Sequence, residues 1–165
     1  MNIYDDLTLI IVTYRSEALI LKNLSILKKF KVIIVDNSNS EKLELITNDY
    51  NIFARKFEDK TTMVKDLLKS KVLLVPGHKA ELYCIAAEEA RELCIPIVTL
   101  GIGSLSERVH HGVTGFIAEN NEEFAYYTLK IFNDTNLWNK LRDNLLNLRG
   151  TKKWSMVASN LLNQI

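Results

Sequence analysis

Short runs of β-branched and other apolar residues alternate with amphipathic segments along most of the chain, and this alternation is the feature that most restricts its fold. Strands that alternate with helical segments indicate βαβ units, which build a parallel sheet covered by helices on both faces. The predicted strands cover residues 7–14, 31–37, 51–57, 71–77, 96–100 and 115–119. The sequence therefore predicts an α/β fold with a doubly wound, parallel, six-stranded sheet of the Rossmann-like type.

Three helical segments follow the last predicted strand, at residues 122–134, 136–148 and 152–165, with no strand between them. They predict a helical C-terminal tail that closes the domain. The chain has 165 residues, 47% of them hydrophobic, which fits one globular domain with a sizeable core. No segment has the composition of an interdomain linker. We therefore expect a single domain over residues 1–165.

Charge and composition exclude several classes of function. Lysine and arginine number 21 against 20 acidic residues, so the chain has no broad basic field and we expect no nucleic-acid partner. The longest apolar run is far shorter than the roughly 20 residues that cross a bilayer, and we expect a cytoplasmic protein without a transmembrane segment. Cys84 and Cys94 have no cluster of further ligands nearby, which indicates core residues and neither a disulfide framework nor a zinc site.

In a parallel sheet of this kind, ligands bind outside the carboxyl ends of the strands, beside helix N-termini that offer free N–H groups. The helix predicted after the fourth strand opens at residues 80 and 81, and it carries Glu81 at its start and Glu89 eight residues later. Eight helical residues span about 12 Å, and carboxylates are acceptors suited to a vicinal diol. A diphosphate would then bind the N–H groups of residues 81–84. Alternatively, Glu81 stands at the helix start only because a negative charge there interacts favourably with the helix dipole. Glu88, Glu89 and Glu92 would then form a solvated stripe.

The same residues carry a resemblance to a known family. Glu81, seven further residues, Glu89, Ala90 and then "CIPIVTL" resemble the nucleotide-sugar-binding C-terminal half of GT-B fold glycosyltransferases, especially glycosyltransferase family 4. Downstream, "SERVHHGVTGFIAEN" at 106–120 is similar to that family's Pro-Glu and GxTG stretch. The segment "KKWSMVASNLL" resembles its closing Trp-containing helix. The resemblance covers residues 71–165.

The resemblance implies roles for particular residues. Glu89 would hydrogen-bond the ribose hydroxyls, and Glu81 would be the catalytic residue beside the donor sugar or the phosphates. Where the family has Gly-aromatic-Gly, this chain has side chains at both flanking positions, which interferes with close approach of a phosphate to the backbone. The resemblance implies that the loop positions Leu82, Tyr83, Cys84 and Gly101 would bind the donor.

The N-terminal half allows two interpretations. It resembles the opening of GT-A glycosyltransferases of family 2, with Asp36 as the nucleotide-contacting residue, but no Asp-x-Asp metal motif follows. Alternatively, residues 7–69 supply the first βα units of the GT-B half, and Arg15 neutralises the diphosphate, although no lysine occurs at the family's usual spacing before Lys22. We favour the second interpretation because it places all the strands in one sheet. The stretch "GIGSLS" at 101–106 lacks the third glycine of a dinucleotide fingerprint, so we do not expect an NAD site.

The resemblance as a whole implies transfer of a glycosyl unit from a nucleotide diphosphate sugar, preferably a uridine one, to a glycan or glycoconjugate acceptor. No metal or other cofactor is expected, because helix N-termini and basic side chains would balance the leaving diphosphate. GT-B enzymes take much of the acceptor site from a second domain, so we expect an acceptor-binding partner subunit or a homo-oligomer. Two other classes stay open: a donor-binding module without catalysis, and an α/β domain that serves only protein interaction.

Overall fold

The computed structural model describes residues 8–13, 15–36, 38, 41–42, 52–56, 59–150, 155 and 159. The chain divides into two compact units, Met1–Lys60 and Thr61–Ile165, which are treated separately below. The single domain expected over residues 1–165 stays a prediction.

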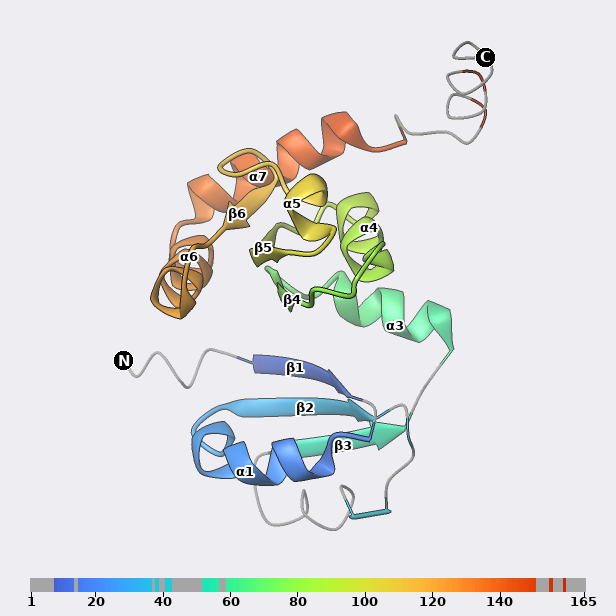
Figure 1. Cartoon of the computed structure of the whole chain (residues 1–165), viewed down its shortest axis with the longest axis vertical. Coiled ribbons are helices and arrows are strands. Elements are labelled where there is room, and N and C mark those ends of the chain that lie inside the picture. Colours follow the sequence, from blue (N-terminus) through green and yellow to red (C-terminus); the bar gives the residue numbers. More distant parts are fainter. Residues whose placement is uncertain are drawn as a thin grey trace. The chain divides into compact units, whose positions relative to one another are not determined.

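The first unit contains a three-stranded parallel sheet and one long helix (Figure 1). Strands β1 (Thr8–Thr13), β2 (Lys31–Asp36) and β3 (Ile52–Lys56) lie in the order β1-β2-β3. Helix α1 (Glu17–Leu27) connects β1 to β2 and packs on the sheet through Ile20, Leu24 and Leu27. The buried core of this unit consists of Ile20, Val32 and Ile34 among the described residues.

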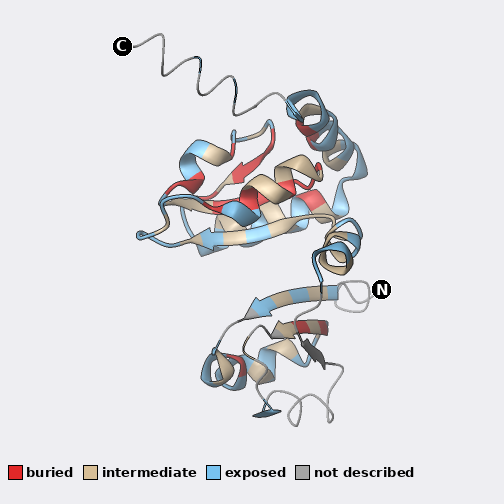
Figure 2. Ribbon diagram, turned by 90° about the vertical axis from the view of Figure 1, so that its right-hand side faces the viewer, coloured by how far each residue is buried: buried red, intermediate tan, exposed pale blue. Residues whose placement is uncertain are grey.

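The second unit begins with α3 and builds a second parallel sheet in the order β4-β5-β6 (Figure 1). Its strands are β4 (Leu73–Gly77), β5 (Ile97–Ile102) and β6 (Gly115–Ile117). Its helices are α3 (Lys60–Leu67), α4 (Ile85–Glu92), α5 (Leu105–Arg108), α6 (Asn121–Asn133) and α7 (Thr135–Leu148). Figure 2 shows that most of the buried residues belong to this unit.

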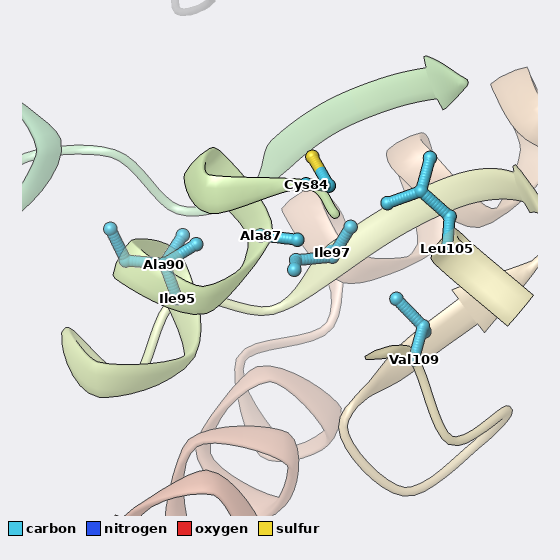
Figure 3. Packing of buried hydrophobic residues seen from close by; sticks show 7 residues of the cluster. All are labelled: Cys84, Ala87, Ala90, Ile95, Ile97, Leu105 and Val109. Atoms are coloured by element: carbon cyan, nitrogen blue, oxygen red, sulfur yellow. The ribbon is translucent and has the colours of Figure 1, made fainter. Parts of the chain in front are cut away.

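Neighbouring residues of β5 face two different cores. Ile97 packs with Ala87 and Ala90 of α4 and with Leu105 of α5 (Figure 3). Val98 belongs instead to a cluster with Phe116 of β6, Ile131 of α6 and Leu141 of α7. Because successive side chains of a strand point to opposite faces, helices cover both faces of this sheet, as the sequence predicted.

All six predicted strands are present, and their ends differ from the prediction by no more than two residues. A single six-stranded sheet is not observed, because the strands lie in two sheets of three. Helices were expected to cover both faces of the sheet, but Val12 of β1 is 66% exposed and Leu74 of β4 is 38% exposed. Both strands are at the edge of their own sheet, which accounts for this exposure.

Pro76 lies inside β4, where it cannot donate a hydrogen bond to a neighbouring strand. The register of β4 against β5 shifts between Val75 and Gly77, so the proline occupies an irregularity of an edge strand. Edge positions and bulges are the places in which a sheet tolerates proline.

The helical tail agrees with the prediction over its first two helices. Asn120 caps α6 by accepting a hydrogen bond from the Glu123 N–H at 2.9 Å, and Asp134 caps α7 through the Leu137 N–H at 2.9 Å. The third predicted helix, 152–165, lies outside the described residues apart from Ser155 and Ser159. Among the residues that the structure describes, no helix has both the length and the apolar character that a membrane span requires.

Candidate functional site

The loop between β4 and α4, residues 78–84, holds Glu81 outside any helix. The Glu81 N–H donates to the His78 carbonyl oxygen at 3.0 Å, and His78 Nδ1 accepts the Ala80 N–H at 3.1 Å. Helix α4 begins only at Ile85, after Cys84 as its N-cap residue. The prediction that residues 80 and 81 open this helix is therefore wrong, and so is the helical spacing inferred between Glu81 and Glu89. The local turn through residues 78–81 uses the N–H group of Glu81 that was expected to bind a phosphate.

Cys84 lies at the start of α4, in the same buried cluster as Ala87 and Leu105 (Figure 3). Burial raises the pKa of its thiol, and the hydrogen bond and negative charge of the Glu81 carboxylate raise it further. The backbone N–H groups of Ala87 and Ala86 act in the opposite direction and lower the pKa in part. The structure thus brings Glu81 and Cys84 together and keeps the thiol protonated, which makes it a poor nucleophile.

The loops after β4 and β5 pack directly against each other. The Ser104 N–H donates to the Glu81 carbonyl oxygen at 3.1 Å. Gly103 has φ +70°, and a Cβ atom at this position would lie 2.5 Å from the His78 carbonyl oxygen and 2.9 Å from that of Glu81. Only glycine permits this backbone approach. Gly101, with φ +66°, is the next-to-last residue of β5 and donates its N–H to Thr99 Oγ1 at 3.0 Å. These two loops therefore meet at the carboxyl ends of β4 and β5.

Glu89 lies in α4, half-buried, and its carbonyl oxygen accepts the Leu93 N–H at 3.0 Å. Leu82 and Tyr83 precede the helix with exposed side chains, 89% and 54% exposed. In the first unit, Arg15 follows β1, is exposed, and donates its backbone N–H to Ser38 Oγ at 3.1 Å. Asp36 is the last residue of β2. The roles assigned to these residues remain predictions.

Sequence reasoning missed a set of charged residues beside this loop. Glu88 Oε2 lies 2.7 Å from Arg91 Nη2, and Glu88 Oε1 lies 3.1 Å from Arg108 Nη1. The Arg108 guanidinium carbon is 4.2 Å from the centre of the Tyr83 ring. Glu88 is therefore a mostly buried ion-pair partner and does not belong to a solvated stripe. No local signal indicates this, because Arg108 is 20 residues away along the chain.

Within the described part of the chain, no three histidine, cysteine, aspartate or glutamate residues lie close enough together to hold a metal ion. At the carboxyl ends of β4 and β5, the structure places Glu81, whose carboxylate is a hydrogen-bond acceptor, in a loop that packs on the backbone of Gly103 and Ser104. Such a site is suited to a ligand with hydroxyl groups and an anionic portion.

Comparison with known proteins gives a consistent family and fold. The model of the family described as "Glycosyl transferases group 1" matches residues 14–147. Because this match includes most of the N-terminal half, it supports the second of the two interpretations of that half. No curated protein matches the sequence significantly.

Several solved structures share the fold at low sequence identity. HepE from Anabaena, in complex with UDP-glucose, has a TM-score of 0.59 at 16% identity, covering 86% of this chain and 43% of HepE. TarM from S. aureus, in a complex that includes UDP, has a TM-score of 0.62 at 20% identity, covering 94% of this chain and 34% of TarM.

The C-terminal domain of LpcC from Francisella tularensis, a glycosyl transferase group 1 family protein, has a TM-score of 0.59 at 14% identity. The alignment covers 90% of this chain and 86% of that domain. The chain thus spans less than half of HepE and TarM, but most of an isolated C-terminal domain. At these identities the likeness shows the fold alone, which is that of one half of a GT-B glycosyltransferase.

Proposed function

Because the chain belongs to the glycosyl transferases group 1 family, we propose that it binds a nucleotide diphosphate sugar and takes part in transfer of the sugar to a glycan or glycoconjugate acceptor. The observation that carries this proposal is the packing of the Glu81 loop on the Gly103–Ser104 loop at the carboxyl ends of β4 and β5. Ligands of doubly wound folds bind at this edge. Glu89 follows on the next helix, within the same unit.

The donor would be recognised at both of its ends. Glu89 accepts hydrogen bonds from the ribose hydroxyls, and Glu81 lies beside the donor sugar, in the manner of family 4 enzymes. A uridine base is the preferred choice, as in the complexes of HepE and TarM. The role expected of Arg15 at the diphosphate stays a prediction, because Arg15 belongs to the other compact unit. The reaction proceeds without a metal or another cofactor, and a cytoplasmic location stays part of this proposal.

Side chains at Leu82 and Cys84 limit how closely a phosphate reaches the loop backbone. The Cys84 sulfur also occupies the start of α4, where the N–H groups of Ala86 and Ala87 point toward it. These N–H groups are then less available to an anion. We infer that donor binding is weaker than in enzymes with glycines at both positions. This departure also favours, as a second candidate function, an α/β domain that serves only protein interaction.

The acceptor side of the reaction needs further protein. The chain corresponds to 43% of HepE and 34% of TarM, each a longer protein. In our proposal, another polypeptide segment, as a partner subunit or a second copy, contributes the acceptor site. A pull-down partner that adds transferase activity to the purified chain would support this arrangement.

Glu89 provides the most direct test of nucleotide binding. Calorimetry with UDP should show saturable binding to the wild type, and Glu89→Gln should weaken it at least about tenfold, because hydrogen bonds to a charged group contribute roughly 1.5–3 kcal/mol. Glutamine keeps the size of the side chain and removes its charge. The matched control is Glu122→Gln, an exposed glutamate in the first turn of α6, which should leave the affinity unchanged.

Different outcomes separate the functional classes. Binding without turnover of UDP-glucose in the presence of acceptors would indicate the non-catalytic module. An absence of binding at millimolar UDP or GDP would contradict the proposal and leave an α/β domain for protein interaction.

A further inference from the structure

A mostly buried network of charges ends on an exposed aromatic ring. The Glu88 carboxylate uses one oxygen for Arg91, at 2.7 Å, and the other for Arg108, at 3.1 Å. Arg91 also pairs with Glu92 at 3.0 Å. On its other side, the Arg108 guanidinium lies 4.2 Å from the centre of the Tyr83 ring. The charges of the network are balanced, and its outermost member is Tyr83.

This arrangement restricts the orientation of the Tyr83 ring, although the side chain is exposed. A guanidinium that stacks on an aromatic face restricts the ring, and the ion pair to Glu88 restricts the guanidinium in turn. Buried ion pairs contribute little net stability, because desolvation offsets much of their attraction. A network of this kind is therefore better explained by the position that it gives to Tyr83 than by a contribution to folding.

Tyr83 also lies close to the candidate site residues in the sequence and in the fold. Tyr83 follows Glu81 by two residues, and Glu88 directly precedes Glu89. Helix α5 contacts the loop from both of its ends: the Ser104 N–H bonds the Glu81 carbonyl oxygen, and Arg108 stacks on Tyr83. The network thus connects the loop that carries Glu81 with the helix that carries Glu89.

We propose that Arg108, oriented by Glu88, is a positioning residue that directs the Tyr83 hydroxyl toward the β-phosphate and sugar of the donor. This inference rests on the proposed function. Leu82 and Cys84 flank Tyr83 and hinder close approach of a ligand to the backbone, whereas a phenol reaches further and both donates and accepts hydrogen bonds. Tyr83 then takes over a contact that loop N–H groups make less well here.

The test compares two ligands by calorimetry on the full chain. UDP-glucose contains the β-phosphate and sugar, and UMP lacks both. Tyr83→Phe keeps the ring and removes the hydroxyl, so it should weaken UDP-glucose binding about 3- to 10-fold and change UMP binding less than about twofold. Arg108→Lys keeps the charge for Glu88 and loses the planar stack, so it should produce the same selective loss.

The double variant tests whether the two residues act together. When Tyr83→Phe is already present, Arg108→Lys should cause no further loss of UDP-glucose affinity, because the hydroxyl that it positions is absent. Tyr126→Phe is the matched control, since Tyr126 is 57% exposed, lies on α6 and has Lys130 Nζ 5.6 Å from its ring. This control should bind both ligands like the wild type.

A second readout needs no ligand. In protein labelled with 3-fluorotyrosine, the Tyr83 ¹⁹F resonance is identified by its absence in Tyr83→Phe. Arg108→Lys and Glu88→Gln should shift this resonance and leave that of Tyr126 in place. A shift under both substitutions, together with the selective loss of UDP-glucose affinity, supports the inference.

Several results would overturn it. Unchanged UDP-glucose selectivity in Arg108→Lys, with or without a loss of thermal stability, would reduce the network to a structural role. Multiplicative losses in the double variant would show that Arg108 acts independently of Tyr83. If the wild type binds neither UDP-glucose nor UMP, the proposed function fails and this inference fails with it. If the wild type binds UDP-glucose but Tyr83→Phe and Arg108→Lys cause no selective, non-additive loss of affinity, only this inference is overturned.

Discussion

Gly112 and Gly115 belong to one short motif, but they are glycines for different reasons. Gly112 has φ +74°, and a Cβ atom there would meet no other atom within 4 Å. Gly115 pairs with Ile97 in the β5–β6 ladder, and a Cβ atom there would overlap the Ile97 carbonyl oxygen. The first glycine thus relieves backbone strain in a turn, and the second allows two strands to approach.

Substitution of these two glycines by alanine should lower the free energy of unfolding by unequal amounts. Gly115→Ala should lower the free energy of unfolding by about 3 kcal/mol, because the β5 backbone must move. Gly112→Ala should cost about 1 kcal/mol, which is the strain of a left-handed conformation in open space. Urea denaturation measures both, with m-values compared to confirm that only stability has changed. Equal losses would contradict the close approach of β6 to β5.

Glu88 and Glu89 are adjacent and identical in type, but their surroundings differ. Glu88 is held between two arginines, whereas Glu89 is the half-buried candidate for nucleotide binding. The sequence allowed both to be surface residues of one stripe. Helical periodicity describes the faces of one helix and contains no information on Arg108, which a different helix contributes.

At the scale of elements, helices α6 and α7 were the best predicted part of the tail. Their starts are encoded locally by the capping residues Asn120 and Asp134. The start of α4 was predicted poorly, because the apolar period continues upstream of Ile85 while the chain forms a turn at His78. Period alone does not distinguish a helical turn from a loop that packs against the next loop.

A hydrogen bond from the Trp138 side chain attaches helix α7 to the segment before β4. Trp138 Nε1 donates to the Lys71 carbonyl oxygen at 2.9 Å, and Lys71 Nζ donates to the Phe132 carbonyl oxygen at 3.1 Å. Trp138→Phe should therefore lower the free energy of unfolding by about 1–2 kcal/mol, because a part-buried carbonyl loses its donor. Circular dichroism during urea denaturation measures this change, with Tyr126→Phe as the control. A urea midpoint equal to that of the wild type would show that this bond does not hold α7.

At the scale of the whole molecule, the two units differ in the size of the core that their described residues form. Of the described residues, the first unit buries Ile20, Val32 and Ile34. The second unit buries two clusters, one on each face of β5. Small units bury a smaller fraction of their surface and are marginally stable. The second unit should therefore be the more stable one.

Hydrogen exchange tests this difference. Backbone amides of β5 should exchange more slowly than those of β2, although both strands are central in three-stranded parallel sheets. Mass spectrometry of peptides that cover Lys31–Asp36 and Ile97–Ile102 provides the comparison. Equal protection, or slower exchange in β2, would contradict the expected order of stability.

The amino-acid sequence by itself determined the six strands, the helices α6 and α7 and the parallel α/β class, because β-branched runs, helical periodicity and capping residues act over a few neighbouring positions. It also indicated the family through the spacing of Glu81, Glu89 and Gly115. Only the tertiary structure decided the start of α4 at Ile85 and the position of Arg108, which pairs with Glu88 and lies over the Tyr83 ring. These features depend on contacts between residues that are distant in the sequence. Packing and desolvation act on side chains that only the complete fold brings together, so local sequence patterns do not encode these contacts.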